Sequence, residues 1–154
     1  MTAPTLIFAW GNPSRGDDAL GPLFIEELRE RLQHRSAWRG IECLTDFQLQ
    51  VEHALDLQDR EQVLFVDASV NCSPPFEVSS LTPYRDLSFT SHAMTPQAVL
   101  QVYLELNYGE LPPSRLLAIR GERFELGTGL GGAARSHLQA ALGWATDWLG
   151  AARD

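Results

Sequence analysis

Three uninterrupted apolar runs constrain the fold of this chain more than any other feature of its sequence. They occupy residues 6–10, 63–66 and 116–119, and each is followed at once by a glycine or a charged residue. Short runs without polar interruption are typical of strands that are buried on both faces, as in parallel sheets that helices cover. The chain is therefore expected to build its core around a mostly parallel sheet.

Helical segments and further strands are predicted between these runs. Residues 20–32, 95–106 and 138–149 carry apolar side chains at helical spacing, and residues 48–57 are predicted as a further helix. Residues 41–44 predict a short strand, and the alternation in residues 76–80 predicts a half-exposed edge strand. This order indicates an α/β fold with about five strands and four helices, the helices lying on both faces of the sheet. A length of 154 residues fits a single domain over 1–154.

The composition argues against several classes of function. Twelve Lys and Arg residues oppose 20 Asp and Glu residues, which gives a formal net charge of −8. An acidic surface repels phosphate backbones, so no nucleic-acid partner is expected. The longest apolar run is far shorter than the roughly 20 residues that span a bilayer, and the N-terminus lacks the basic and apolar regions of a signal peptide. With only two cysteines, the chain is expected to be soluble and cytoplasmic, with no membrane partner.

Residues able to contact a metal stand at the ends of the predicted strands and helices. In open α/β sheets, ligands bind beyond the carboxyl ends of the strands. Asp18 follows the first strand, within the segment Gly-Asn-Pro-Ser-Arg-Gly-Asp-Asp-Ala-Leu-Gly at 11–21, and Asp67 follows the second apolar run. His92 precedes a predicted helix. Two carboxylates and one imidazole would form an oxygen and nitrogen site for a divalent metal, with coordination positions left open.

Structural interpretations of the same residues stay open from spacing alone. Asp17 or Asp18 could cap the helix that follows them, and Asp67 could begin a turn. A single histidine in a loop is most often solvated. The 11–21 segment also resembles a phosphate-binding turn, but it lacks the GxGxxG and GK[ST] patterns, so it is only a weak sign of nucleotide binding.

No serine, cysteine or further histidine is identified as a catalytic group. Cys43 is expected in the core, and Ser69 is expected in a turn close to the site. His53 lies in a predicted helix with polar neighbours and is expected to be solvated. The attacking group of a hydrolytic reaction is therefore not identified by the sequence.

Three motifs occur in order along the chain: the 11–21 segment after the first strand, Val-Asp-Ala at 66–68, and Ser-His at 91–92 ahead of a Thr-Pro helix start. Together they resemble the hydrogenase maturation endopeptidases, the proteases that process [NiFe] hydrogenase large subunits. The resemblance runs over essentially the whole chain and implies a twisted five-stranded sheet flanked by helices. It also implies an enzyme, an endopeptidase that removes a short C-terminal extension from the large-subunit precursor once nickel has been inserted.

The resemblance assigns roles to three residues. The metal-contacting residues of the family fall on Asp18, Asp67 and His92, which would also be the catalytic residues. They would contact nickel that the precursor carries, so no permanently bound cofactor is expected. A metal-polarised water or carbonyl would then allow hydrolysis of the peptide bond.

Three more residues are candidates for binding the substrate or supporting the site: Arg15, Asp17 and Asp46. Many family members carry Asp-Gly-Gly-Thr after the second strand, whereas this chain reads Asp-Phe-Gln-Leu at 46–49. Losing two glycines stiffens the segment and adds bulk, which suits a role in substrate selectivity. The Phe-Gln-Leu-Gln version is similar to proteases that serve soluble NAD-reducing hydrogenases.

Two functions of other classes compete with proteolysis. One is a non-catalytic nickel-binding assembly factor that checks or delivers the metal. The other is a phosphorylase-like or nucleoside-processing α/β enzyme with the same architecture. Incubation with nickel-loaded precursor, followed by measurement of its C-terminal mass, would separate all three.

Overall fold

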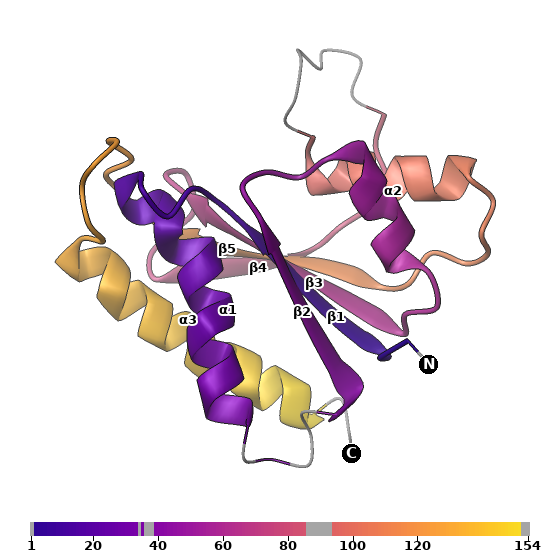
Figure 1. The fold of residues 1–154 in the computed structure, drawn as a ribbon, viewed down its shortest axis with the longest axis horizontal. Helices are drawn as coiled ribbons and strands as arrows, with labels where there is room; N and C mark the ends of the chain where they lie inside the picture. Colours follow the sequence, from indigo (N-terminus) through magenta and orange to yellow (C-terminus); the bar gives the residue numbers. More distant parts are fainter. Residues whose placement is uncertain (1, 34, 36–38, 86–93, 152–154) are drawn as a thin grey trace.

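A computed structural model describes residues 2–33, 35, 39–85 and 94–151. Its five strands are β1 (Thr5–Trp10), β2 (Ile41–Asp46), β3 (Gln62–Ser69), β4 (Phe76–Ser80) and β5 (Ser114–Arg120). They form one sheet in the order β2-β1-β3-β5-β4 (Figure 1). All neighbouring pairs are parallel except β4 and β5, which pair antiparallel at one edge. The expected mostly parallel five-stranded sheet is confirmed.

Helices cover both faces of this sheet (Figure 1). The helices α1 (Leu20–Leu32) and α3 (Gly132–Ala151) lie on one face, and α2 (Pro96–Glu105) and the 3-10 helix η3 (Val51–Leu57) lie on the other. The four expected helices are present, although residues 51–57 form a 3-10 helix rather than an α-helix. Within the described ranges, a helix that could span a bilayer is absent.

The side chains of β3 explain why its sequence is apolar throughout. Successive side chains of a strand point to opposite faces of the sheet. Val63 and Phe65 belong to the core cluster beneath α2 and η3, while Leu64 and Val66 belong to the cluster beneath α1 and α3. All four are at most 1% exposed. Burial on both faces leaves no position in this run where a polar side chain would reach water.

The strand order creates a switch point between β1 and β3. From β1 the chain passes through α1 to β2 on one side of β1, and it then passes through η3 to β3 on the other side. In open α/β sheets, ligands bind at such a switch point, beyond the carboxyl ends of the strands. The 11–21 segment and the end of β3 occupy this place, so the fold positions Asp18 and Asp67 where ligands bind.

Asp67 lies inside β3, which corrects the expectation that it follows a strand ending at residue 66. The strand continues to Ser69 because β5 pairs with it that far, and Asp67 stands opposite Ala118 in the parallel register. Asp67 therefore does not begin a turn. Because side chains alternate between the two faces of a sheet, the position of Asp67 in the strand determines the face to which its side chain points.

Candidate functional site

The segment after β1 folds back so that Asp18 meets Asn12. The backbone N–H of Asn12 donates to Oδ2 of Asp18 at 2.7 Å, and the N–H of Asp18 donates to the carbonyl oxygen of Arg15 at 3.0 Å. Oδ1 of Asn12 accepts from the N–H of Ser14 at 2.8 Å, which is an Asx turn. Among the described residues, no donor contacts the second carboxylate oxygen of Asp18. One oxygen is therefore fixed and the other is available to a ligand.

Two glycines of this segment allow the backbone to approach closely. Gly11 has a φ of 151°, and a Cβ atom built there would lie 2.1 Å from the carbonyl oxygen of Asp18. Gly16 has a φ of 54°, and its Cβ would lie 2.4 Å from the carbonyl oxygen of Arg123. Both backbone conformations strongly favour glycine. The two glycines thus have a structural explanation, which is the tight packing that places Asp18.

Asp17 is a buried carboxylate, 2% exposed, that binds three backbone N–H groups. Its Oδ2 accepts from Glu122 at 2.7 Å and from Arg123 at 3.1 Å, and its Oδ1 accepts from Gly131 at 2.9 Å. Burial alone would raise the pKa of Asp17, but these N–H groups outweigh it and hold the pKa below the usual 3.8. Asp17 therefore ties the first segment to the loop 121–131 between β5 and α3.

Backbone hydrogen bonds reinforce the same connection. The N–H of Gly16 donates to the carbonyl oxygen of Thr128 at 3.0 Å. The N–H of Gly127 donates to the carbonyl oxygen of Ser14 at 2.7 Å. The N–H of Asp17 donates to the carbonyl oxygen of Arg123 at 2.7 Å. The loop 121–131 and the segment after β1 are thus one connected unit, although more than 100 residues separate them in sequence.

Neither Asp17 nor Asp18 caps α1, so this expectation is wrong. Both lie in the short 3-10 helix η1 (Gly16–Ala19), and Ala19 stands at the N-cap of α1 with no side-chain hydrogen bond. The two carboxylates accept from distant or preceding N–H groups instead. Asp17 holds the loop 121–131 against the segment after β1, and its role in supporting a site stays a prediction.

Asp18 follows β1 and Asp67 lies near the end of β3, so the two carboxylates flank the switch point from either side. Burial raises the pKa of Asp67 to about 7, the N–H of Ala68 lowers it, and the charge of Asp18 raises it. A carboxylate whose ionised form is disfavoured by burial and by a second carboxylate gains from a bound cation. The structure thus brings Asp18 and Asp67 to one edge of the sheet, and their role as metal contacts stays a prediction.

His92, the third residue of the predicted set, lies outside the described residues. Within the described part of the chain, no group of three His, Cys, Asp or Glu side chains is placed to hold a metal ion. The two carboxylates are therefore the part of the predicted site that can be described. Arg15 is exposed on the segment after β1, and its contact with a substrate also stays a prediction.

Asp46 ends β2 and binds a histidine that the sequence placed in solvent. Its Oδ2 lies 3.1 Å from Nε2 of His53, and its Oδ1 accepts from the N–H of Phe47 at 2.7 Å. The N–H of Gln50 donates to Nδ1 of His53 at 2.8 Å, so the ring proton resides on Nε2 and is donated to Asp46. The side chain of His53 is only 12% exposed, and the expectation of a solvated histidine is wrong. This pair holds the segment after β2 in place.

Neither the thiol of Cys43 nor the hydroxyl of Ser69 is activated as a nucleophile by a described residue. Cys43 is buried as expected, and burial raises the pKa of its thiol to about 11, so the reactive thiolate is suppressed. Oγ of Ser69 accepts from the N–H groups of Asn71 at 3.1 Å and Cys72 at 3.2 Å. Among the described residues, no base hydrogen-bonds the hydroxyl of Ser69. It forms the turn that the sequence predicted.

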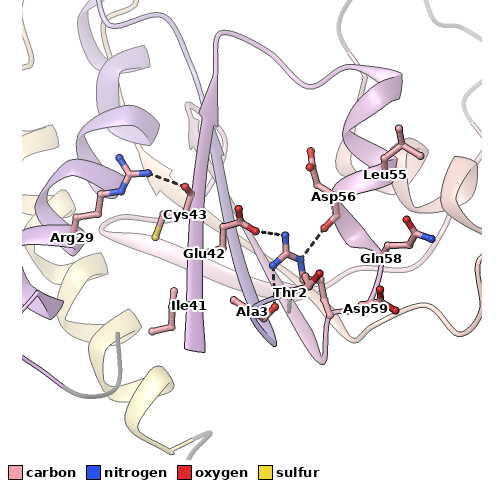
Figure 2. A pocket seen from close by; sticks show the side chains of 11 residues that line it. Thr2, Ala3, Arg29, Ile41, Glu42, Cys43, Leu55, Asp56, Gln58 and Asp59 are labelled. Carbon is pink, nitrogen blue, oxygen red and sulfur yellow. Dashed lines mark hydrogen bonds and ion pairs between the residues drawn. The ribbon is translucent and has the colours of Figure 1, made fainter. Parts of the chain in front are cut away.

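A pocket of about 680 Å³ lies at the opposite edge of the sheet, where the strands begin (Figure 2). Arg60, whose side chain is 4% exposed, donates to the carbonyl oxygens of Asp56 and Ala3 and pairs with Glu42. Figure 2 shows these acceptors gathered around one guanidinium group. Each nitrogen of this guanidinium donates one hydrogen bond within the chain, so Arg60 connects the start of the chain, β2 and η3 at this pocket.

No protein-family model matches the chain, and no curated protein matches it. Solved structures do match it. The [NiFe] hydrogenase maturation protease HycI from Thermococcus kodakarensis KOD1 is 20% identical with a TM-score of 0.71, over 96% of this chain and 92% of that chain. The hydrogenase maturating endopeptidase HybD from E. coli is 20% identical with a TM-score of 0.74, over 96% and 93%. A hydrogenase 2 maturation peptidase from a Thaumarchaeota archaeon is 21% identical with a TM-score of 0.63, over 95% and 97%. The chain has the fold of these proteases over nearly its whole length.

Proposed function

We propose that this chain is a hydrogenase maturation endopeptidase that acts in the cytoplasm. It removes the C-terminal extension of a [NiFe] hydrogenase large-subunit precursor after nickel insertion, and it recognises the nickel of that precursor. The observation that carries the proposal is the placement of Asp18 after β1 and of Asp67 near the end of β3, at the β1/β3 switch point. The fold shared with named maturation proteases supports the reaction class, and the three sequence motifs support the substrate.

The two carboxylates suit contact with a dication that arrives with the substrate. Asp18 keeps one oxygen on the N–H of Asn12, which fixes the direction of the other oxygen. Burial and the neighbouring charge raise the pKa of Asp67, so its ionised form gains from a positive partner. Two carboxylates together match the charge of the nickel ion, and His92 would supply a nitrogen contact.

Hydrolysis would follow from positioning. With the nickel of the precursor held between the carboxylates, the bond to be cut would be fixed at the carboxyl edge of the sheet. A metal-polarised water or carbonyl would allow water to add to the peptide carbonyl, and the products would be a carboxylate and an amine. Asp17 and Asp46 would support this edge, and Arg15 would contact the substrate tail.

Cleavage of nickel-loaded precursor is the test of this function. The full chain is incubated with the precursor of a soluble NAD-reducing hydrogenase and, separately, with precursors of other [NiFe] hydrogenases, and the intact mass of each precursor is measured. We expect one mass to fall by that of a C-terminal segment. Tight binding of nickel-loaded precursor with no change in mass would identify an assembly factor instead. No binding and no cleavage would favour an unrelated α/β enzyme.

A further inference from the structure

A second pocket of about 460 Å³ begins at Asp67 itself. It is separate from the Arg60 pocket and lies beside the carboxyl end of β3 and the middle of β5. Its lining residues are Asp67, Ala68, Ser69, Val70, Asn71, Leu116, Ala118 and Phe124. A site of this size lies within the range of ligand pockets and has room for a side chain together with part of its backbone.

The sheet register explains how this pocket is built. Asp67 of β3 stands opposite Ala118 of β5, and Phe65 stands opposite Leu116. Residues two apart on a strand share a face, so all four belong to the face that η3 and α2 cover. Leu116 and Ala118 are nevertheless only half-buried, and among the described residues α2 and η3 leave this part of the face partly open. The pocket is therefore a continuation of the core face toward Asp67.

The loop that Asp17 holds supplies one wall. Phe124 lies between Arg123, whose N–H donates to Asp17, and the rest of the loop 121–131. A Cβ atom built on Gly121 would lie 3.0 Å from Cζ of Phe124, so the ring packs directly against the backbone there. The wall is thus fixed by a buried carboxylate and by close packing.

The lining determines the chemistry that fits. Among the described lining residues, Asp67 is the one ionisable group and the others are apolar or neutral, so none of them offers a basic side chain to an acidic ligand. In the proposed function Asp67 contacts nickel, which leaves only uncharged surface for the remainder of the ligand. An alanine at 118 keeps the floor open beside Asp67.

We propose that this pocket binds one uncharged, apolar side chain of the polypeptide substrate, at a residue flanking the cleaved bond. Ala118 forms the floor that sets the allowed size, and Phe124 forms the wall. The inference rests on the proposed function. Asp67 lines the pocket, and a peptide is assigned as the occupant because Asp67 contacts the peptide substrate in that proposal. Ala118 is accordingly a specificity-determining residue.

The test first locates the cut bond from the product mass, and then varies each flanking residue of the nickel-loaded precursor to Leu, Ala, Lys and Asp. At one of the two positions, kcat/KM should be at least about tenfold higher for Leu than for Lys or Asp. The variant Ala118→Leu should lower kcat/KM for the Leu precursor about tenfold or more, while the Ala precursor changes by less than about threefold. The control Ala140→Leu adds the same volume at an exposed position of α3 and should change neither.

Several outcomes would overturn the subsite. These are equal cleavage of all precursors, a preference for Lys or Asp at both positions, or an equal effect of Ala118→Leu on every precursor. If Ala118→Leu fails to fold, Phe124→Ala is measured instead, and it should raise the kcat/KM of a Trp precursor relative to the Leu precursor. No shift in that ratio would reject the wall. Failure of the unaltered chain to cut any precursor would reject the proposed function, and the subsite with it, whereas normal cutting without selectivity rejects the subsite alone.

Discussion

Adjacent aspartates in this chain have different surroundings and different tasks. Asp17 is buried and satisfied by three backbone N–H groups, while Asp18 is half-buried and accepts from the N–H of Asn12. Sequence alone makes both of them equivalent cap candidates. The distinction arises from donors that lie more than 100 residues away, which no local pattern contains.

Replacing Asp17 by asparagine should destabilise the protein. Both carboxylate oxygens receive N–H donors, so an amide would place its own NH₂ group against at least one of them. A buried donor left unsatisfied costs about 1–3 kcal/mol, and chemical denaturation at pH 7 should show a loss in the free energy of unfolding of that size. Asp147→Asn, at an exposed position of α3, should change it by less than about 0.5 kcal/mol.

The effect of Asp17→Asn should also depend on pH. The pKa of Asp17 is lowered in the folded chain, so its contribution to stability is present above the ordinary value of 3.8 and is lost as pH falls through the lower folded pKa. The difference between the original chain and the variant should therefore shrink below about pH 4. An unchanged difference down to pH 2 would contradict the assigned hydrogen bonds.

Asp67 should show the opposite dependence. Its pKa is raised to about 7, so between pH 3.8 and 7 the folded chain keeps a proton that the unfolded chain has released. The free energy of unfolding then decreases as pH rises through this window, and Asp67→Asn removes that decrease. In the metal-free chain, the variant should gain roughly 1–3 kcal/mol relative to the original between pH 5 and 8.

Cleavage by the same variant should nevertheless be strongly impaired. An amide lacks the charge that matches a dication, and a loss of about 100-fold corresponds to roughly 2.7 kcal/mol of transition-state stabilisation. Near-normal cleavage by folded Asp67→Asn would remove Asp67 from the site.

At the scale of the elements, the sequence predicted what local burial determines. β1, β3 and β5 were predicted because apolar runs are buried on both faces, and α2 was predicted from Thr95, whose Oγ1 does accept from the N–H of Ala98 at 3.1 Å. The end of β3 was missed because pairing with β5 extends it. The Asp46–His53 pair was missed because it requires the exact path of η3. Local patterns contain neither piece of information.

A glycine around the candidate site should tolerate substitution by alanine only where the added Cβ atom has space. Gly11→Ala would bring a Cβ atom against the backbone of Asp18 at a positive φ, so it should lower stability by more than about 1 kcal/mol and abolish cleavage. Gly129→Ala is the matched control, because nothing lies within 4 Å of its Cβ position. Thermal unfolding and the precursor assay check both. Equal stability and equal cleavage by the two variants would show that the close approach of Gly11 to the backbone of Asp18 does not position Asp18.

At the scale of the whole molecule, the two edges of the sheet have different uses. The edge where strands begin is tied together by Arg60, whose partners all belong to the chain. The edge where strands end presents Asp18 and Asp67, with a pocket beside them. Under the proposed function, the formal net charge of −8 would add to the attraction for a substrate that carries a cation.

The C-terminal mass of one large-subunit precursor, measured with and without its nickel, tests the central claim most directly. Both forms are incubated with the same amount of the full chain, with serine- and thiol-directed inhibitors present in parallel samples. The account predicts that only the nickel-loaded precursor is shortened and that the inhibitors change nothing. Equal shortening of the metal-free precursor would contradict recognition through nickel.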